Sequence, residues 1–163
     1  MSDPILKVTD LKMHFPVFKG VLKRQVASVK AVDGVSFSVD VGKTFGLVGE
    51  SGSGKSTVGN CILKRVKLTD GSVVYKGRDL ADVSKSEMRT LRQDLQMITQ
   101  DPYGSLDPRQ SVYQVIAEGI RIHGLLSSEA DIKARVEELM DMVGLNPAFS
   151  VRYPHEFSGG QRQ

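Results

Sequence analysis

The sequence predicts an α/β fold with an additional helical part. Short apolar runs typical of β-strands alternate with helical patterns as far as Thr99, and only helical patterns follow that residue. A glycine-rich turn over residues 49–54 connects a strand pattern to a helix pattern. We therefore expect a mainly β part over residues 1–45, a core over residues 46–100 and a helical part over residues 101–163.

The composition is that of an ordinary globular protein. Hydrophobic residues make up 40% of the 163 residues and charged residues 25%, which disfavours disorder, and no apolar run approaches the length of a membrane span. The first residues lack the pattern of an export signal. A single cysteine excludes an internal disulfide and a cysteine-rich zinc site. The formal charge of +3 is too small to indicate a dedicated nucleic-acid binder.

The first forty residues contain two strand patterns, Ile5–Val8 and Val29–Val39. Pro16–Ala27 lies between them without periodicity, and we expect it to be a long loop. Basic residues outnumber the acidic Asp3 and Asp10 over the first thirty positions, where they are Lys7, Lys12, Lys19, Lys23, Arg24 and Lys30. This imbalance favours a solvated hairpin and loop, and weak attraction to an anionic surface or ligand is the alternative.

The core begins with a strand pattern, Phe45–Val48, and a helix pattern that starts at Lys55. One face of this helix is apolar and contains Val58, Cys61, Ile62 and Val66. Because Cys61 belongs to that face, we expect a buried structural thiol rather than a reactive one.

Two more strand patterns complete the core, Ser72–Tyr75 and Leu95–Thr99. Between them, Ser84 and Glu87 have the spacing of a capping box, which predicts a short helix ending at about Arg92.

The helical part begins after a loop over Gln100–Arg109. A first helix is expected over Ser111–Arg121. Ser128 is the expected cap of a second helix that ends at Gly144, and its apolar face is predicted to contain Ile132, Val136, Leu139 and Val143.

The strongest motif of the chain matches G-x-x-x-x-G-K-[ST] and consists of Gly49, Glu50, Ser51, Gly52, Ser53, Gly54, Lys55 and Ser56. Glycines allow successive backbone amide groups to point at an anion, and the start of the helix adds partial positive charge. Lys55 can reach the β- and γ-phosphates, and the Ser56 hydroxyl can bind Mg²⁺. A chance glycine turn is disfavoured because the motif lies between a strand and a helix. The chain is thus expected to contain a P-loop NTPase core.

Further motifs restrict the class of nucleotide-binding protein. The Asn-Lys-x-Asp motif of guanine-specific GTPases does not occur in the sequence. A P-loop kinase is compatible with the size, but it would leave Ser158–Gln161 without a purpose. In that segment Ser158 precedes two glycines at a helix start, where it can both cap the helix and contact phosphate.

In this order of motifs the chain resembles the ATP-binding subunit of ABC transporters. Gly49–Thr57 is similar to the Walker A motif, Gln100 to the Q-loop glutamine and Phe157–Gln161 to the signature motif, with Phe157 where most members have leucine. The segments 32–37, 100–109 and 155–163 are similar to the dipeptide and oligopeptide importer branch.

The resemblance implies ATP and Mg²⁺ as cofactors and a head-to-tail dimer with a second ATP-binding subunit. Lys55 and Gln100 would be catalytic, Ser56 and Gln100 would contact the metal, and Phe15 would either stack on adenine or belong to the core. The residues facing the nucleotide of the other subunit would be Ser158, Gly159, Gly160 and Gln161.

The resemblance also implies partners in a membrane. These are transmembrane permease subunits and, indirectly, a periplasmic or extracellular peptide-binding protein, with the chain peripheral at the cytoplasmic face of a bacterial or archaeal membrane. Nucleic acid is not expected as a partner. The alternative is a soluble ABC-type ATPase in DNA repair or translation.

One part of the family pattern is not matched. The family has an apolar strand ending in Asp-Glu after the signature motif, and the sequence contains no Asp-Glu dipeptide. Its histidines, His14, His123 and His155, all precede the end of the signature motif. We therefore expect a fragment that binds nucleotide weakly, does not sustain hydrolysis and self-associates through an unpaired apolar sheet edge.

Overall fold

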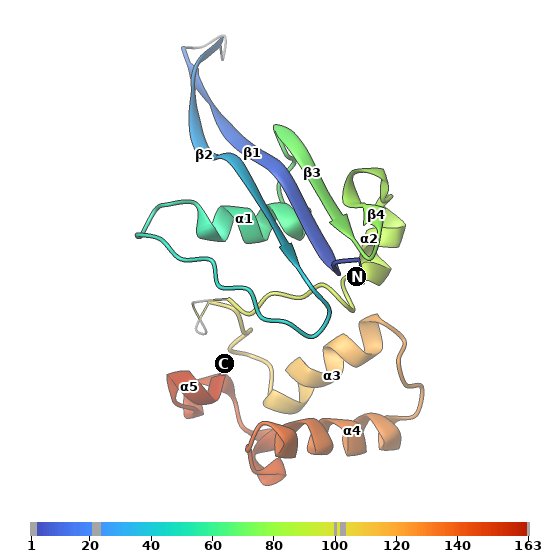
Figure 1. The fold of residues 1–163 in the computed structure, drawn as a ribbon. Helices are drawn as coiled ribbons and strands as arrows, with labels where there is room; N and C mark the ends of the chain where they lie inside the picture. The colour runs from blue at the N-terminus through green and yellow to red at the C-terminus, as the bar shows by residue number, and fades with distance from the viewer. Residues whose placement is uncertain (1–2, 21–23, 100, 102–103, 163) are drawn as a thin grey trace. The chain divides into compact units, whose positions relative to one another are not determined.

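The computed structural model describes residues 3–20, 24–99, 101 and 104–162. It divides into two compact units, Met1–Gln96 and Met97–Gln163, and each is described here by itself. The first unit contains a sheet and the glycine-rich turn, and the second contains only helices and loops (Figure 1). None of the helices in the described residues is long and apolar enough to cross a membrane.

A long antiparallel hairpin dominates the first unit. Its strands are β1 (Leu6–Lys19) and β2 (Arg24–Val39). On the other side of β1 lies β3 (Asp70–Tyr75), followed by the short β4 (Arg78–Asp79), so the sheet order is β2-β1-β3-β4. Because β3 pairs with β1 only as far as Lys12, the remainder of the hairpin is a ribbon of two strands (Figure 1).

The helix α1 (Lys55–Ile62) packs on one face of this sheet (Figure 1). The buried cluster between them includes Leu11, Met13, Val32, Val58 and Cys61. Cys61 is 3% exposed, and burial raises the pKa of its thiol, which confirms the prediction of a structural cysteine.

The first unit continues with a 3-10 helix, η1 (Leu80–Asp82), and with α2 (Lys85–Leu91). The predicted capping box is confirmed, because the Glu87 amide donates to the Ser84 hydroxyl and the Glu87 carboxylate accepts from the Ser84 amide.

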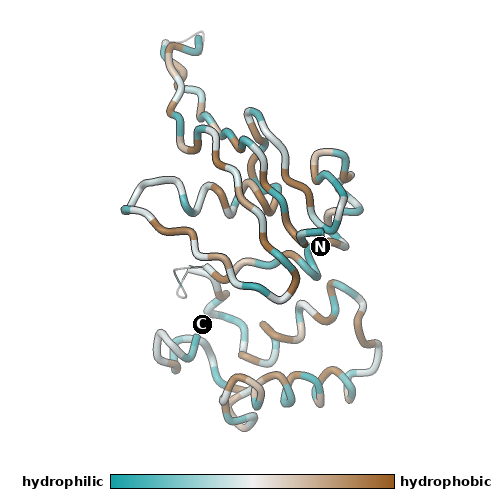
Figure 2. Tube along the Cα trace, viewed as in Figure 1, coloured by the Kyte–Doolittle hydropathy of each residue, from teal (hydrophilic) through white to brown (hydrophobic). Residues whose placement is uncertain are grey.

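The second unit is built on two capped helices, α3 (Val112–Ile122) and α4 (Glu129–Met142). The cap of α4, Ser128, is the one that the sequence predicts, whereas Ser111, the predicted first residue of the helix, is the cap of α3. Hydrophobic and hydrophilic residues alternate around α4 (Figure 2). The 3-10 helices η2 (Pro147–Val151) and η3 (Pro154–Glu156) and the single turn α5 (Gly159–Arg162) complete the unit.

The predicted long loop over Pro16–Ala27 is wrong, because β1 extends to Lys19 and β2 begins at Arg24. Pro16 pairs with Ser28 inside the ribbon. The proline, which has no backbone N–H, is tolerated because β3 does not reach this far. Beyond Lys12, β1 is an edge strand, where an outward N–H would have no strand to bind.

Two predicted strands, Phe45–Val48 and Leu95–Thr99, are wrong as well. Both segments lie outside the four strands found in the described residues. A strand exists only where a neighbour supplies hydrogen bonds, and no described strand lies beside these segments. Val48 and Ile98 are accordingly 93% and 81% exposed.

Two helix predictions require smaller corrections. The helix α1 ends at Ile62 rather than near Val66, and Lys64 adopts a left-handed conformation with φ of 52°. In α4 the face that includes Ile132 and Val136 is completed by the fully buried Met140, whereas the predicted Val143 is 72% exposed and the predicted Leu139 is only partly buried. The periodicity predicts the helix correctly, but the buried residue of its last turns is Met140 rather than the neighbouring Leu139.

Candidate functional site

The candidate site is the phosphate loop, defined as Gly49–Thr57. The backbone of Gly52 and Gly54 is left-handed, with φ of 81° and 93°, and α1 begins directly afterwards at Lys55. The Val58 amide donates to the Gly54 carbonyl at 2.9 Å, which closes the first helical turn. No side chain caps α1 at Gly54, so the first amide groups of the helix have no capping partner. Such amide groups bind anions.

Gly54 is held against the hairpin by a close backbone contact. A Cβ atom at this position would lie 2.2 Å from the Ala31 carbonyl oxygen. The hairpin ladder shifts at this point, because Met13 pairs with Val32 whereas His14 pairs with Lys30, which leaves Ala31 as the extra residue of a β-bulge. The bulge therefore lies against the phosphate loop, and only glycine fits at residue 54.

The Lys55 ammonium group folds back onto its own loop. Its Nζ donates to the carbonyl oxygens of Gly49 at 2.7 Å and Glu50 at 2.6 Å, and to the Ser53 hydroxyl at 3.3 Å. These bonds place a full positive charge inside the loop, near the orphan amide groups of α1. Loop and lysine together form an electropositive site for a phosphate chain.

Phe15 lies on the hairpin close to this loop. It pairs with Val29, two residues from the bulge at Ala31. Phe15 and the buried Met13 are two positions apart on β1, so both side chains point to the face on which α1 packs. Phe15 is 40% exposed and thus outside the core, which excludes the alternative of a core residue.

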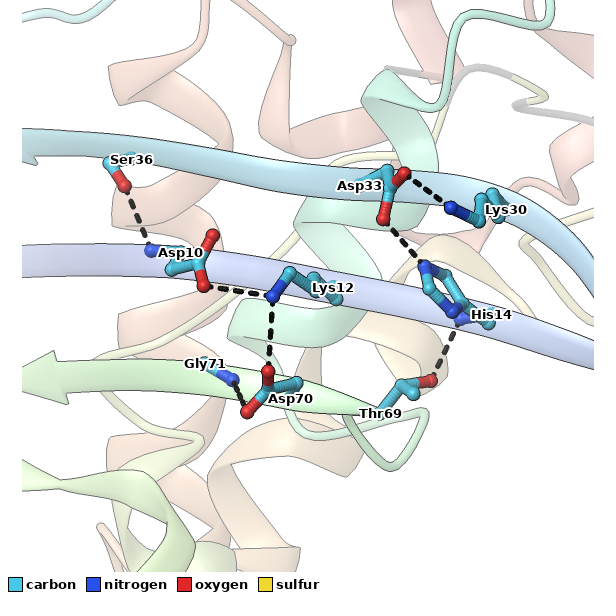
Figure 3. A network of polar contacts seen from close by, with 9 residues as sticks. All are labelled: Asp10, Lys12, His14, Lys30, Asp33, Ser36, Thr69, Asp70 and Gly71. Carbon is cyan, nitrogen blue, oxygen red and sulfur yellow. Dashed lines mark hydrogen bonds and ion pairs between the residues drawn. The ribbon is translucent and has the colours of Figure 1, made fainter.

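A polar network fixes the hairpin where it passes the loop (Figure 3). His14 contacts Asp33 through Nε2 at 2.8 Å, and its backbone amide donates to the Thr69 hydroxyl at 2.8 Å. Lys30 donates to the other carboxylate oxygen of Asp33 at 3.0 Å. Hydrogen bonds from Lys30 first and His14 second hold the pKa of Asp33 below its usual range.

A second ion-pair cluster ties β1 to β3 nearby (Figure 3). Lys12 contacts Asp10 at 2.9 Å and Asp70 at 3.1 Å. Neither cluster can be predicted from the sequence, because their members are up to 58 positions apart and single charged residues in strands carry no spacing signal.

The predicted signature residues lie in the second unit, at the start of α5. The Ser158 amide donates to Gln161 Oε1 at 3.0 Å, and the Gln161 amide donates to the Ser158 hydroxyl at 3.4 Å. Phe157 is 7% exposed and meets Phe149 edge to face, with ring centroids 6.3 Å apart. Ser158 thus caps α5 as predicted, while a Cβ atom at Gly159 or Gly160 would meet no atom within 4 Å.

Gln100, the predicted Q-loop residue, lies outside the described residues. Ser56 is exposed on the first turn of α1, which leaves its hydroxyl accessible to a metal ion. Within the described ranges, no group of three or more histidine, cysteine or acidic residues could hold a metal by itself. A hydroxyl beside a phosphate site fits Mg²⁺, which usually keeps several waters and binds through substrate phosphates.

The second unit also contains an apolar cavity of about 520 Å³. Its lining includes Val115 and Ile116 of α3, Met140 of α4, and Phe157 and Gly160 beside the signature residues. The lining is mainly apolar but also includes Gln161 and Arg162, and all of its residues belong to the second unit.

Comparison with known proteins gives consistent results. The family model described as ABC transporter matches residues 32–163. The chain is 46% identical to the oligopeptide transport ATP-binding protein AppF of Bacillus subtilis, covering 99% of this chain and 49% of the relative. It is 48% identical to the glutathione import ATP-binding protein GsiA of Escherichia coli, covering 99% of this chain and 26% of that protein. The chain therefore spans half or less of these relatives.

Solved structures share the fold. The ATP-binding cassette MJ0796, in a dimeric structure bound to ADP and phosphate, superposes with a TM-score of 0.78 at 22% identity, over 96% of this chain and 65% of that one. The protein cbiO1 of Clostridium perfringens, part of an ABC transporter complex, gives a TM-score of 0.77 at 24% identity, over 99% of this chain and 58% of that one. With the matched family model and the architecture of the phosphate loop, these likenesses lead to one conclusion: the chain belongs to the ABC transporter family.

Proposed function

We propose that this chain binds ATP with Mg²⁺ and belongs to the energy-coupling subunit of a transporter that imports oligopeptides or dipeptides. The observation that carries the proposal is the Lys55 ammonium group, held inside the phosphate loop by the carbonyls of Gly49 and Glu50 at the start of α1. The substrate class is supported by the similarity to relatives such as AppF, an oligopeptide transport ATP-binding protein.

Each residue of the loop has a defined task in this proposal. The amide groups that follow Gly54 bind phosphate oxygens, and Lys55 exchanges its carbonyl partners for the β- and γ-phosphates. The Ser56 hydroxyl holds the Mg²⁺ ion that neutralises charge on the phosphates. Phe15 stacks on the adenine, because it is exposed on the hairpin face that adjoins the loop.

The proposed assembly places a second ATP-binding subunit across the nucleotide. In it, Ser158, Gly159, Gly160 and Gln161 of one subunit contact the ATP held by the other, and Gln100 contacts the Mg²⁺ ion and the attacking water. Transmembrane permease subunits anchor the pair at the cytoplasmic face of a bacterial or archaeal membrane, and a peptide-binding protein delivers the substrate. The expectation that this chain alone binds nucleotide weakly and does not sustain hydrolysis stays a prediction.

A binding experiment with Lys55→Ala tests the nucleotide site. We expect at least a tenfold weaker affinity for Mg²⁺-ATP, because the loop loses the point charge that meets the phosphates. The matched control is Lys67→Ala, which removes an exposed lysine from the segment after α1. Displacement of a fluorescent ATP analogue measures both variants. Equal affinities of the two variants would contradict the proposal.

The base site is tested by Phe15→Ala, with Phe18→Ala as its control. Phe18 belongs to the same strand, but its side chain points to the other face of the ribbon. We expect Phe15→Ala to weaken ATP binding by about fivefold, as lost stacking of about 1 kcal/mol predicts, and Phe18→Ala to leave it unchanged.

A pull-down experiment tests the transporter assignment. Retention by permease subunits of a peptide importer is the expected result. Retention by DNA or ribosomes instead would favour the alternative of an ABC-type ATPase in repair or translation.

A further inference from the structure

The outer end of the hairpin is a surface that the proposed function does not use. We define the tip ribbon as residues 16–19 of β1 and 24–28 of β2. Every one of its residues is exposed, including Val17 at 39%, Phe18 at 57% and Val26 at 58%. The third strand, β3, ends its pairing at Lys12, so the ribbon has two strands and no covering layer (Figure 1). Isolated two-stranded ribbons are marginally stable in water.

The tip ribbon is also strongly positive. No aspartate or glutamate occurs between Asp10 and Asp33 in the sequence. At the end of the ladder Lys19 pairs with Arg24, and within the described residues neither side chain forms an ion pair. Lys30, closer to the phosphate loop, is by contrast bound to Asp33.

Apolar residues occupy both faces of the ribbon. Val17 and Phe18 are consecutive in β1 and point to opposite faces, and Val26 is the extra residue of a bulge, because Val17 pairs with Ala27 and Phe18 with Gln25. Hydrophobic and hydrophilic residues are mixed along this part of the hairpin (Figure 2). A flat protein partner would cover one face, whereas a lipid interface surrounds an inserted tip.

We infer that the tip ribbon binds the surface of an anionic lipid bilayer directly. Phe18, Val17 and Val26 enter the interface between headgroups and acyl chains, and Lys19 and Arg24 contact lipid phosphates. A second copy of this chain is disfavoured as the occupant, because its tip carries the same positive charge. The inference does not depend on nucleotide, since Lys55 and the phosphate loop take no part in it.

A tryptophan reporter tests this contact. The sequence contains no tryptophan, so Phe18→Trp places a single reporter in the tip ribbon. On vesicles of phosphatidylglycerol and phosphatidylcholine without nucleotide, we expect a blue shift of its emission and quenching by brominated lipid. Tyr153→Trp, 43% exposed in the second unit, is the control and should show neither effect. Equal quenching of the two reporters, or of neither, would overturn the inference.

Charge variants provide a second measurement. Lys19→Gln with Arg24→Gln should lower partition into anionic vesicles about thirtyfold, as the loss of two cations at the surface, each contributing about 1 kcal/mol, predicts. Lys7→Gln with Lys43→Gln removes the same charge from exposed positions away from the tip and should have little effect. Circular dichroism verifies that both variants fold.

Three results of these measurements would overturn the inference. The first is an equal loss of partition in the two double variants, and the second is equal partition of the protein into neutral and anionic vesicles. The third is tip-dependent binding to polyglutamate that is tighter than binding to vesicles, which would indicate an acidic protein partner. Because Lys55-dependent ATP binding is measured separately, failure here leaves the proposed function untouched, and the reverse also holds.

Discussion

The two glycine-rich turns of the chain differ in what requires their glycines. In the phosphate loop, Gly54 has a φ of 93° and lies so close to the Ala31 carbonyl that no Cβ atom fits. At the start of α5, Gly159 and Gly160 are helical and have open space where a Cβ atom would be. The fold of the chain thus requires glycine at residue 54, whereas the described contacts do not require it at residues 159 and 160.

This difference bears on the ligands proposed for the two turns. The phosphate loop is complete within the first unit, since hairpin, loop and α1 shape it together. Gly159 and Gly160 make no described contact that excludes a side chain, so a requirement for glycine would have to come from a group outside the described contacts of the second unit. A nucleotide held by a second subunit, as proposed above, is such a group.

The largest expected effect is that of Gly54→Ala. The new methyl group collides with backbone, and the left-handed φ adds strain, so we expect a loss of about 3 kcal/mol in the free energy of unfolding, together with loss of ATP binding. Gly52→Ala is the matched control. It has a similar φ of 81° but no atom within 4 Å of the added Cβ atom, so it should cost about 1–2 kcal/mol. Urea unfolding of both variants measures the difference.

If Gly54→Ala and Gly52→Ala were equally stable, the contact with Ala31 would not be what requires glycine at residue 54. The distinction between the two turns would then rest on φ alone.

The phosphate loop could be predicted from sequence because its glycine, lysine and serine have a rigid spacing, whereas its contact with the bulge at Ala31 could not. A bulge depends on the register of two strands, and the sequence of either strand alone does not determine that register. The end of α1 was missed for a similar reason. Lys64 leaves the helix with its ammonium group bound to the carbonyls of Leu80 and Val83, a contact set by tertiary structure.

The length of the hairpin could not be predicted, because Pro16 and the lack of alternation over residues 16–27 are typical of loops. The strands predicted over Phe45–Val48 and Leu95–Thr99 do not form. Both segments have the composition of buried strands, but no described strand pairs with them. Apolar composition predicts the tendency of a segment to be buried, and pairing decides whether a strand forms. The capped helices were predicted well because Ser111, Ser128 and Ser84 act on amide groups three positions away.

A smaller effect is expected at Ser158. Ser158→Ala removes the cap of α5 and should cost the second unit about 1 kcal/mol, as Ser84→Ala should cost α2. Ser158→Asp keeps an acceptor for the Gln161 amide and should retain stability, but its negative charge would repel a nucleotide phosphate. We therefore expect Ser158→Asp to abolish ATP-dependent pairing of two subunits, measured by sedimentation. Pairing that survives in Ser158→Asp would remove Ser158 from the proposed interface.

Gly160→Ala should have an effect of opposite sign on stability. Because this glycine is helical and unobstructed, alanine should raise the free energy of unfolding of the second unit by about 0.5 kcal/mol. Urea unfolding measures this gain, and the same variant should weaken ATP-dependent pairing if a nucleotide approaches the turn. A loss of stability instead would mean that the fold itself requires this glycine, as it does at Gly54.

The smallest effect is a difference in acid sensitivity between the Ser84 cap of α2 and the Ser158 cap of α5. Hydrogen bonds from Ser84 first and from Arg78 second lower the pKa of Glu87 to about 2, below its usual value of 4.5. A lowered pKa means that the ionised carboxylate stabilises α2 above about pH 4.5 and that this contribution is lost as the pH falls toward 2. Gln161, the corresponding residue of α5, does not titrate, so its cap should be insensitive to acid. Carbon-detected NMR titration of Glu87 with amide protection in α2 and α5 measures this contrast, and Glu87→Gln should make α2 as insensitive as α5.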